Sequence, residues 1–568
     1  MTVTLLRAAV CAATLACVPP PAGADDRPGT AVAAPGVPGA TELEARGATI
    51  GAVRVYVQNI FDNSDPRESQ PPYRLANRLH YATREGTIRR QLLFVSGERL
   101  VAQRLEESER ILRTRPYLND AWILPVAYDA ARNVADLAVT VRDVWTLNPS
   151  ISFGRAGGSN HTRLQLEDKN LFGSGIQASI GRSRDVDRTG TLFSYFDPDI
   201  GREWVQLGLG YADNSDGRVK SLDLERPFYA LDVRRAGGVD VLDGRSVVSR
   251  YSAGAVADEF EQQHRRFGAY YGWSAGLRGD FAQRWLAGMR YDESRFARRP
   301  DLTLQPAVLP PEWRFADPWL GWQLVENRYL KSENLDLIGR TEDLYLGRSL
   351  YLELGYTTPA FGADQAAWLP RATALAGWQF DAQQMLFVNA SFDGRIPRGT
   401  PRSTAPGARA GAPALANATL AAQARYFWRL TPHQLFYASL SGTTTSRLDP
   451  ERQVLLGGDT GLRGYPLRFQ GGTSSAHLTL EHRVFTDWYP LRLARIGGAL
   501  FFDAGRTFGR NFLGVEPLGL LKDAGLGIRV GNNRSGLGNV LHIDLSYALD
   551  APPGVRRYQV TVQTLDRF

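Results

Sequence analysis

Short segments in which apolar and polar residues alternate recur over roughly 420 residues, from about Leu147 to the C-terminus, and this pattern most constrains the fold of the chain. Successive side chains of a β-strand point to opposite faces, so this period of two predicts strands. Gly, Asp, Asn and Pro separate the segments, and no convincing amphipathic helix pattern occurs among them. Clear examples are residues 203–212, 420–429 and 540–549.

The two faces of these segments differ in a way that is typical of a transmembrane β-barrel. One face is a continuous apolar band and the other carries charged residues, over segments of about ten residues. A soluble barrel alternates equally well, but aromatic residues near segment ends, such as Tyr426, Trp428 and Tyr547, and a C-terminal aromatic favour the membrane. At about 26 residues per strand and connection, we expect about sixteen antiparallel strands in residues 147–568.

The N-terminus predicts export. Residues 1–24 contain Arg7, a short apolar run and the small residues Ala22-Gly23-Ala24, which is the arrangement of a cleaved signal peptide. A buried N-terminal helix and a lipid anchor at Cys17 are the alternatives. Cys11 and Cys17 are the only two cysteines, so the exported chain would have no disulfide and no thiolate site.

Between the signal and the barrel we expect two further regions. Residues 25–48 are rich in Pro, Gly and Ala and predict a flexible linker. Residues 49–146 predict a small α+β domain: a strand near 50–57, a helix near 101–112, and strands near 121–128 and 136–142. The predicted fold class is therefore mainly β, with one small α+β domain before a large barrel.

Composition and motifs argue against several function classes. The net charge is +7, but the basic residues are scattered rather than clustered, so we expect no nucleic-acid partner. The chain has no HExxH pair, GxSxG turn or phosphate-binding loop, and His477 and His482 fall on opposite faces of one strand. We therefore expect no catalytic residues, no cofactor and no metal.

Three motifs in order carry a resemblance to a known family. Thr87-Ile88-Arg89-Arg90 through Arg110 is similar to the core of a polypeptide-transport-associated (POTRA) domain, and 168–175 matches an "NLFGxG" segment. Residues 462–465, Leu-Arg-Gly-Tyr, match the [VI]RG[FY] motif of the sixth extracellular loop, with Leu at the first position. The chain thus resembles the outer-membrane protein assembly factor and bacterial surface antigen superfamily, whose branches include BamA, TamA and the two-partner secretion transporters.

The resemblance implies that Arg463 folds back into the barrel lumen and meets acidic side chains, with Gly464 and Tyr465 beside it. The alternation permits this independently, because it places Glu481 and Asp503 on the luminal faces of the next two strands. A planar guanidinium can bind two carboxylates with directional, charge-assisted hydrogen bonds. The alternative is that Arg463 is an ordinary loop arginine whose side chain is in solvent.

The expected function is the insertion, assembly or translocation of client polypeptides at the outer membrane, without nucleotide hydrolysis. A weakly paired seam between the first and last strands would template client strands. The expected partners are clients, outer-membrane lipid, and a periplasmic or inner-membrane partner of the POTRA-like domain. A two-partner-type secretion pore and a passive porin or structural surface antigen are the alternatives. The expected seam residues are Ile151, Phe153, Tyr558, Val560 and Phe568.

Overall fold

A computed structural model describes residues 35–201, 203–398, 415–536 and 540–565. The predicted signal peptide and Phe568 lie outside the described residues. Contacts group residues 33–568 into one compact unit. Among the described helices, none has the length and apolar character that crossing a membrane requires.

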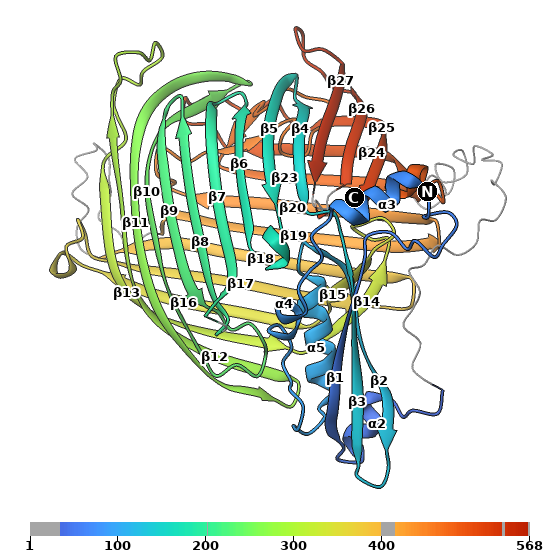
Figure 1. Cartoon of the computed structure of the whole chain (residues 1–568). Coiled ribbons are helices and arrows are strands. Elements are labelled where there is room, and N and C mark those ends of the chain that lie inside the picture. Colours follow the sequence, from blue (N-terminus) through green and yellow to red (C-terminus); the bar gives the residue numbers. More distant parts are fainter. Residues whose placement is uncertain (1–34, 202, 399–414, 537–539, 566–568) are drawn as a thin grey trace, which may run out of the picture. The chain divides into compact units, whose positions relative to one another are not determined.

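The N-terminal region is a small mixed sheet with helices (Figure 1). β1 lies beside β3 in parallel, and β2 pairs with the other edge of β3 in antiparallel fashion. Buried Leu105 and Leu112 of α5 belong to the same core as Val139 of β3. The elements are α2 (Ala40–Ala45), β1 (Thr49–Gln58), α3 (Pro71–Leu79), α4 (Glu85–Arg89), α5 (Ala102–Arg113), β2 (Leu118–Asp129) and β3 (Val134–Asp143).

The stretch predicted as a flexible linker is partly structured. Its residues 40–45 form α2, and Leu43 is fully buried in the N-terminal core, because one apolar side chain among small and acidic residues is enough to dock a short helix. The strand and helix pattern of the region matches the small α+β fold expected from the sequence. Its assignment as a POTRA domain stays a prediction.

The rest of the described chain forms a closed antiparallel barrel of twenty strands (Figure 1). The strands are β4 (Leu147–Ala156), β5 (Ser159–Asp168), β6 (Gln177–Arg184), β7 (Thr189–Ile200), β8 (Val205–Asn214), β9 (Gly217–Arg226), β10 (Arg235–Ser252), β11 (Ala255–Arg278), β12 (Phe281–Ala297), β13 (Trp313–Glu326), β16 (Arg348–Thr357), β17 (Ala367–Gln379), β18 (Gln384–Pro397), β19 (Ala416–Thr431), β20 (Gln434–Ser446), β23 (Ser474–Phe485), β24 (Ala494–Phe508), β25 (Leu521–Asn532), β26 (Val540–Ala548) and β27 (Tyr558–Leu565).

The prediction of about sixteen strands was wrong. The estimate of about 26 residues per strand and connection assumed long loops, whereas several connections are tight turns. Only Gly157 and Gly158 separate β4 from β5, and only Ala253 and Gly254 separate β10 from β11. Short turns leave room in the same length of chain for four more strands.

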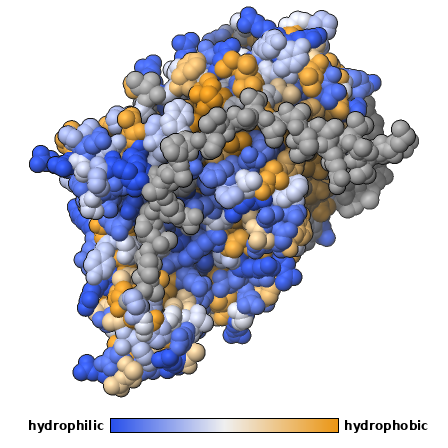
Figure 2. Space-filling model, turned by 90° about the vertical axis from the view of Figure 1, so that its right-hand side faces the viewer, coloured by the Kyte–Doolittle hydropathy of each residue, from blue (hydrophilic) through white to orange (hydrophobic). Residues whose placement is uncertain are grey.

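The barrel wall alternates as the sequence predicts. In β25, Leu526 and Ile528 face outward and are about half exposed (54% and 51%), whereas Asp523 and Arg529 are fully buried on the inner face. Hydrophobic side chains also lie at the surface in the upper half of Figure 2, beside large hydrophilic areas. An apolar outer face over a charged inner face fits a barrel surrounded by lipid.

The two ends of the barrel differ. We call the end that contacts the N-terminal region the domain end, and the opposite end the loop end. At the domain end the "NLFGxG" segment forms the turn between β5 and β6. Asn170 donates to the Thr83 hydroxyl (2.8 Å), and the Thr87 hydroxyl donates to the Gly173 carbonyl (2.9 Å). This motif therefore fastens the first strands to the N-terminal region.

A hairpin at the domain end enters the barrel. It connects β13 to β16 and consists of β14 (Tyr329–Glu333) and β15 (Thr341–Tyr345); we call residues 329–345 the insert hairpin. Its tip residues Leu335 and Ile338 are buried against inner-wall side chains that include Phe427 and Tyr437. Arg113 of α5 holds its stem through a bidentate pair with Asp343 (2.6 and 2.8 Å).

Candidate functional site

The candidate site is built around the glycine-rich loop 457–466, which lies between β20 and β23. Two short strands, β21 (Val454–Leu456) and β22 (Gln470–Gly472), pair with each other and close the base of this segment. A β-carbon on Gly464 would lie 2.7 Å from the Asp523 side chain, and Gly461 has a φ of +113°. Glycine is required at both positions for the loop to approach the inner wall.

Arg463 reaches two carboxylates on the inner wall. Its Nε and Nη2 donate to the two oxygens of Asp503 (2.7 and 3.0 Å), and its Nη1 donates to Glu481 (2.9 Å). Both carboxylates are buried, and the Arg463 side chain is 13% exposed. A guanidinium fork that fills a bidentate site and a second acceptor fixes both the position and the orientation of the loop.

Further luminal groups complete the surroundings of Arg463. Asp544 of β26 lies 3.4 Å from Nη1, and the guanidinium stacks over the Phe501 ring at 3.5 Å from its centroid. Asp503 also accepts from the Thr479 hydroxyl (2.8 Å). We call Arg463, Glu481, Asp503 and Asp544 the luminal cluster. Its three carboxylates lie on three strands, β23, β24 and β26.

The rest of the loop is anchored by burial. Leu462 and Tyr465 are both fully buried in a small apolar cluster with Leu521 and Ala548. The Tyr465 hydroxyl donates to the Lys522 carbonyl (2.9 Å), so the ring is buried with its polar atom satisfied. The loop is thus packed against the C-terminal strands by apolar as well as charged contacts.

A second arginine fastens the other side of the loop. Arg468 makes a bidentate pair with Asp187 in the turn between β6 and β7 (2.8 and 2.6 Å). Its guanidinium lies over the Tyr251 ring at 4.3 Å, and the Tyr251 hydroxyl donates to the same Asp187 (2.6 Å). The hydrogen bond from Arg468 lowers the pKa of the Asp187 carboxyl below its ordinary value.

Close backbone contacts add to this second attachment. A β-carbon on Gly157, in the turn between β4 and β5, would lie 2.3 Å from the Leu467 backbone nitrogen. One on Gly458 would lie 2.6 Å from the Gly157 Cα. The segment from Gly457 to Arg468 therefore contacts strands from both ends of the barrel sequence.

These two groups of strands meet at the seam between β27 and β4. Among the described residues this seam has one residue pair, Val562 with Arg155, whereas eight pairs join β26 to β27 and ten join β4 to β5. A barrel interface with so few pairs leaves strand-edge N–H and C=O groups without ladder partners. The carboxylates of the luminal cluster lie on one side of this interface, and Asp187, the partner of Arg468, lies on the other.

Of the residues that the sequence singled out, the structure brings together the five of the loop site. Arg463, Glu481 and Asp503 are in contact, with Gly464 and Tyr465 beside them. Phe153 lies in β4, and Tyr558 and Val560 lie in β27, while Ile151 belongs to β4 by its backbone. The structure does not pair the predicted seam residues with one another, since the described seam pair is Arg155 with Val562.

Two points were missed. Loop 457–466 belongs to the eighth connection at the loop end, not the sixth, because the barrel has twenty strands. The contacts of Arg463 with Asp544 and of Arg468 with Asp187 were not predicted, because no motif marks them.

No protein-family model matches the chain, and no curated protein matches it. Several solved structures are similar to it. They include BamA from Haemophilus ducreyi lacking POTRA domains 1–3 (12% identity, 90% of this chain and 84% of that chain, TM-score 0.37), CdiB from Escherichia coli (11%, 91% and 76%, 0.46) and the FrpB iron transporter from Neisseria meningitidis (8%, 80% and 88%, 0.36).

Proposed function

We propose that this chain is an outer-membrane β-barrel of the assembly factor and surface antigen superfamily that inserts or translocates client polypeptides through a lateral opening. The observation that carries the proposal is that the described residues of β27 and β4 form a single registered pair. Separating these strands costs few hydrogen bonds and exposes two strand edges. A client strand can pair with such an edge through main-chain hydrogen bonds, which requires no nucleotide hydrolysis.

The loop contacts support the same proposal. A weak seam alone would leave the barrel prone to opening, but the segment from Gly457 to Arg468 bridges the strands on both sides of it. Arg463 holds the C-terminal strands and Arg468 holds the turn after β6. Opening would therefore require one of these attachments to release, and we expect release of the more exposed one, Arg468.

Two other functions remain as alternatives. A dedicated secretion pore would pass its substrate along the lumen, yet the insert hairpin and loop 457–466 both occupy the lumen. A passive porin meets the same objection and has no need for a weakly paired seam. Both alternatives predict that covalent closure of the seam leaves function unchanged.

The proposal is tested by closing the seam. Arg155→Cys with Val562→Cys joins the one registered pair, whose Cα separation in an antiparallel ladder suits a disulfide. The control is Leu545→Cys with Val560→Cys, a registered pair within the regular ladder of β26 and β27. The natural chain has two cysteines, both before residue 25, so no native thiol of the barrel competes.

The readout is the outer-membrane protein content of a deletion strain complemented with each variant. We expect the oxidised seam variant to restore insertion but not the outer-membrane profile, with recovery on reduction. The oxidised control pair should restore both. A fully oxidised, inserted seam variant that restores the profile would exclude lateral opening.

A further inference from the structure

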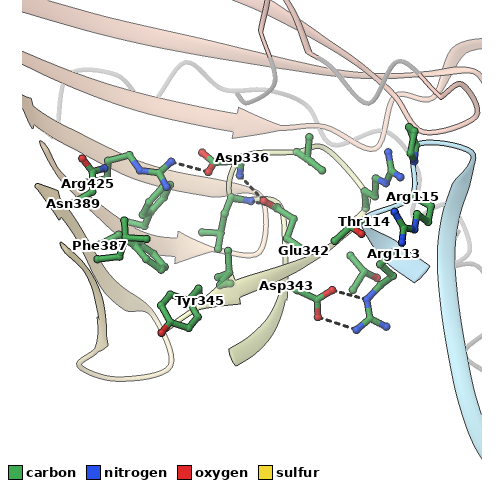
Figure 3. Close-up of a pocket in the computed structure, with 18 of the residues that line it drawn as sticks. Arg113, Thr114, Arg115, Asp336, Glu342, Asp343, Tyr345, Phe387, Asn389 and Arg425 are labelled. Atoms are coloured by element: carbon green, nitrogen blue, oxygen red, sulfur yellow. Dashed lines mark hydrogen bonds and ion pairs between the residues drawn. The ribbon is translucent and has the colours of Figure 1, made fainter. Parts of the chain in front are cut away.

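A cavity of about 720 Å³ lies between the insert hairpin, the end of α5 and the inner wall of the barrel (Figure 3). Its volume falls in the range of small-molecule sites. Five cationic and three anionic side chains line it, with an apolar part formed by the wall. The cations are Arg113, Arg115, Lys169, Arg340 and Arg425, and the anions are Asp336, Glu342 and Asp343.

The three anions are already occupied. Asp343 accepts two hydrogen bonds from Arg113, and Asp336 accepts one from Arg425 (2.8 Å), as the dashed lines in Figure 3 show. Glu342 accepts from the backbone N–H groups of Leu335 and Asp336 (2.9 and 3.0 Å). These carboxylates therefore pair with two of the five cations.

The other three cations, Arg115, Arg340 and Lys169, have hydrogen-bond donors available to a ligand. Arg115 donates from Nε to Gln91 (2.6 Å), and Arg340 donates from Nη2 to the Leu118 carbonyl (2.6 Å). Within the described part of the chain, no carboxylate lies within 4 Å of either guanidinium, and Lys169 has only Glu167, at 3.9 Å. Burial lowers the pKa of both arginines, so neighbouring carboxylates do not offset the loss of water.

The opposite side of the cavity is apolar. Phe387, Leu375 and Phe427 of the inner wall line it, together with Tyr345 of the insert hairpin. In Figure 3 the Phe387 and Tyr345 side chains lie on one side and Arg115 on the other. A ligand that satisfies both sides needs an anionic group joined to an apolar one.

We propose that this cavity binds a small amphiphilic anion, with its phosphate or carboxylate on Arg115, Arg340 and Lys169 and its apolar part against Phe387. Two arginines and a lysine supply the forked donors and the point charge that such oxygens accept. The site is independent of the seam, because none of its lining residues belongs to β4 or β27.

The test uses the full chain in lipid nanodiscs and titration calorimetry with phenyl phosphate, benzoate, inorganic phosphate and phenol. We expect phenyl phosphate and benzoate to bind, inorganic phosphate to bind at least tenfold more weakly, and phenol not to bind. Arg115→Gln with Arg340→Gln should weaken phenyl phosphate at least tenfold, since each lost charge-assisted hydrogen bond changes Kd by about that factor.

Two further variants keep the test decisive. Lys169→Gln removes a positive charge whose carboxylate neighbour, Glu167, is 3.9 Å away. This variant should therefore fold normally and still weaken the binding of phenyl phosphate severalfold. Arg132→Gln, whose side chain is 83% exposed on the turn after β2, is the matched control and should bind as the natural chain does. Unchanged affinity in the double variant and in Lys169→Gln, no binding of phenyl phosphate or benzoate, or equal binding of inorganic phosphate would overturn the proposal.

Discussion

At the scale of single residues, Arg463 is the centre of a buried group of three carboxylates. Glu481, Asp503 and Asp544 all lie within 3.4 Å of its guanidinium, and all three carboxylates are buried. Arg483 and Arg529 also pair with this group of acids, so the site is a network of alternating charges rather than one pair. Networks of this kind lose more than one interaction when one member is removed.

We expect Arg463→Ala to lower the free energy of unfolding by about 3–5 kcal/mol, because the buried carboxylates lose a partner. Arg463→Lys should recover part of the loss, since an ammonium cannot fill a bidentate site and a second acceptor together. The measurement is denaturant-induced unfolding of the folded barrel in detergent. Arg510→Ala, which removes an exposed pair with Glu516, is the control and should change little.

Asp187 makes the second attachment sensitive to acid. Its pKa is lowered in the folded state, so its contribution to stability is present above the ordinary pKa of 3.8 and is lost as the pH falls through the lower folded value. Asp187→Asn should cost about 1 kcal/mol at pH 7, and the difference from the natural chain should shrink as the pH falls below 3.8 and disappear below the lower pKa of the folded state. Asp213→Asn, at an exposed pair with Arg218, is the control for unfolding curves across this range; a pH-independent difference at Asp187 would contradict the prediction.

The sequence allowed these contacts to be predicted only where the two partners lie in neighbouring segments of the chain. The alternation placed Glu481 and Asp503 on the luminal face, and the glycines around Arg463 indicated a close approach. Asp187 lies 281 residues from Arg468, and nothing local in either segment relates them. Such a pair becomes visible only when the strand count and the closure of the barrel are known.

At the scale of elements, the insert hairpin is the part that sequence reasoning missed. Its strands have five residues each, and its tip packs Leu335 and Ile338 into the lumen, a position that alternation cannot predict for a connection. The strand count failed for a related reason: period two identifies strands but does not show how short the turns are. Strands such as β8, β19 and β26 and the small α+β region, by contrast, were predictable because each has a sustained period.

The hairpin should block the lumen from the domain end. Ile338 is buried against the inner wall, so Ile338→Asp places a charge without a partner there and should displace the tip. We expect a several-fold higher conductance in planar bilayers while the barrel itself stays folded. Val308→Asp, at a position that is 81% exposed in the loop between β12 and β13, is the matched control. Equal conductance in the two variants would mean that the hairpin does not limit the lumen.

At the scale of the whole molecule, the question is whether the loop stabilises the barrel or the seam. Arg463 has all its acidic partners on β23, β24 and β26, which remain joined to one another when β27 and β4 separate. Arg468 instead joins the loop to the turn between β6 and β7, on the other side of the seam. Only the second attachment should oppose opening. The two arginines therefore make different predictions when the seam is closed covalently.

We expect Arg468→Ala to lower the midpoint of thermal unfolding in the natural chain and to have little effect when Arg155→Cys and Val562→Cys form a disulfide. The disulfide and Arg468 both hold the two sides of the seam together, so their effects on the midpoint of thermal unfolding should not add. Arg463→Ala should lower the midpoint of thermal unfolding equally with and without the disulfide, because the contacts of Arg463 lie on one side of the seam. The six chains, namely the natural chain, Arg468→Ala and Arg463→Ala, each with and without the cysteine pair, are compared by heat-dependent mobility of the folded barrel, oxidised and reduced. An Arg468→Ala loss that persists in the oxidised form would mean that this arginine stabilises the loop alone and does not hold the seam closed.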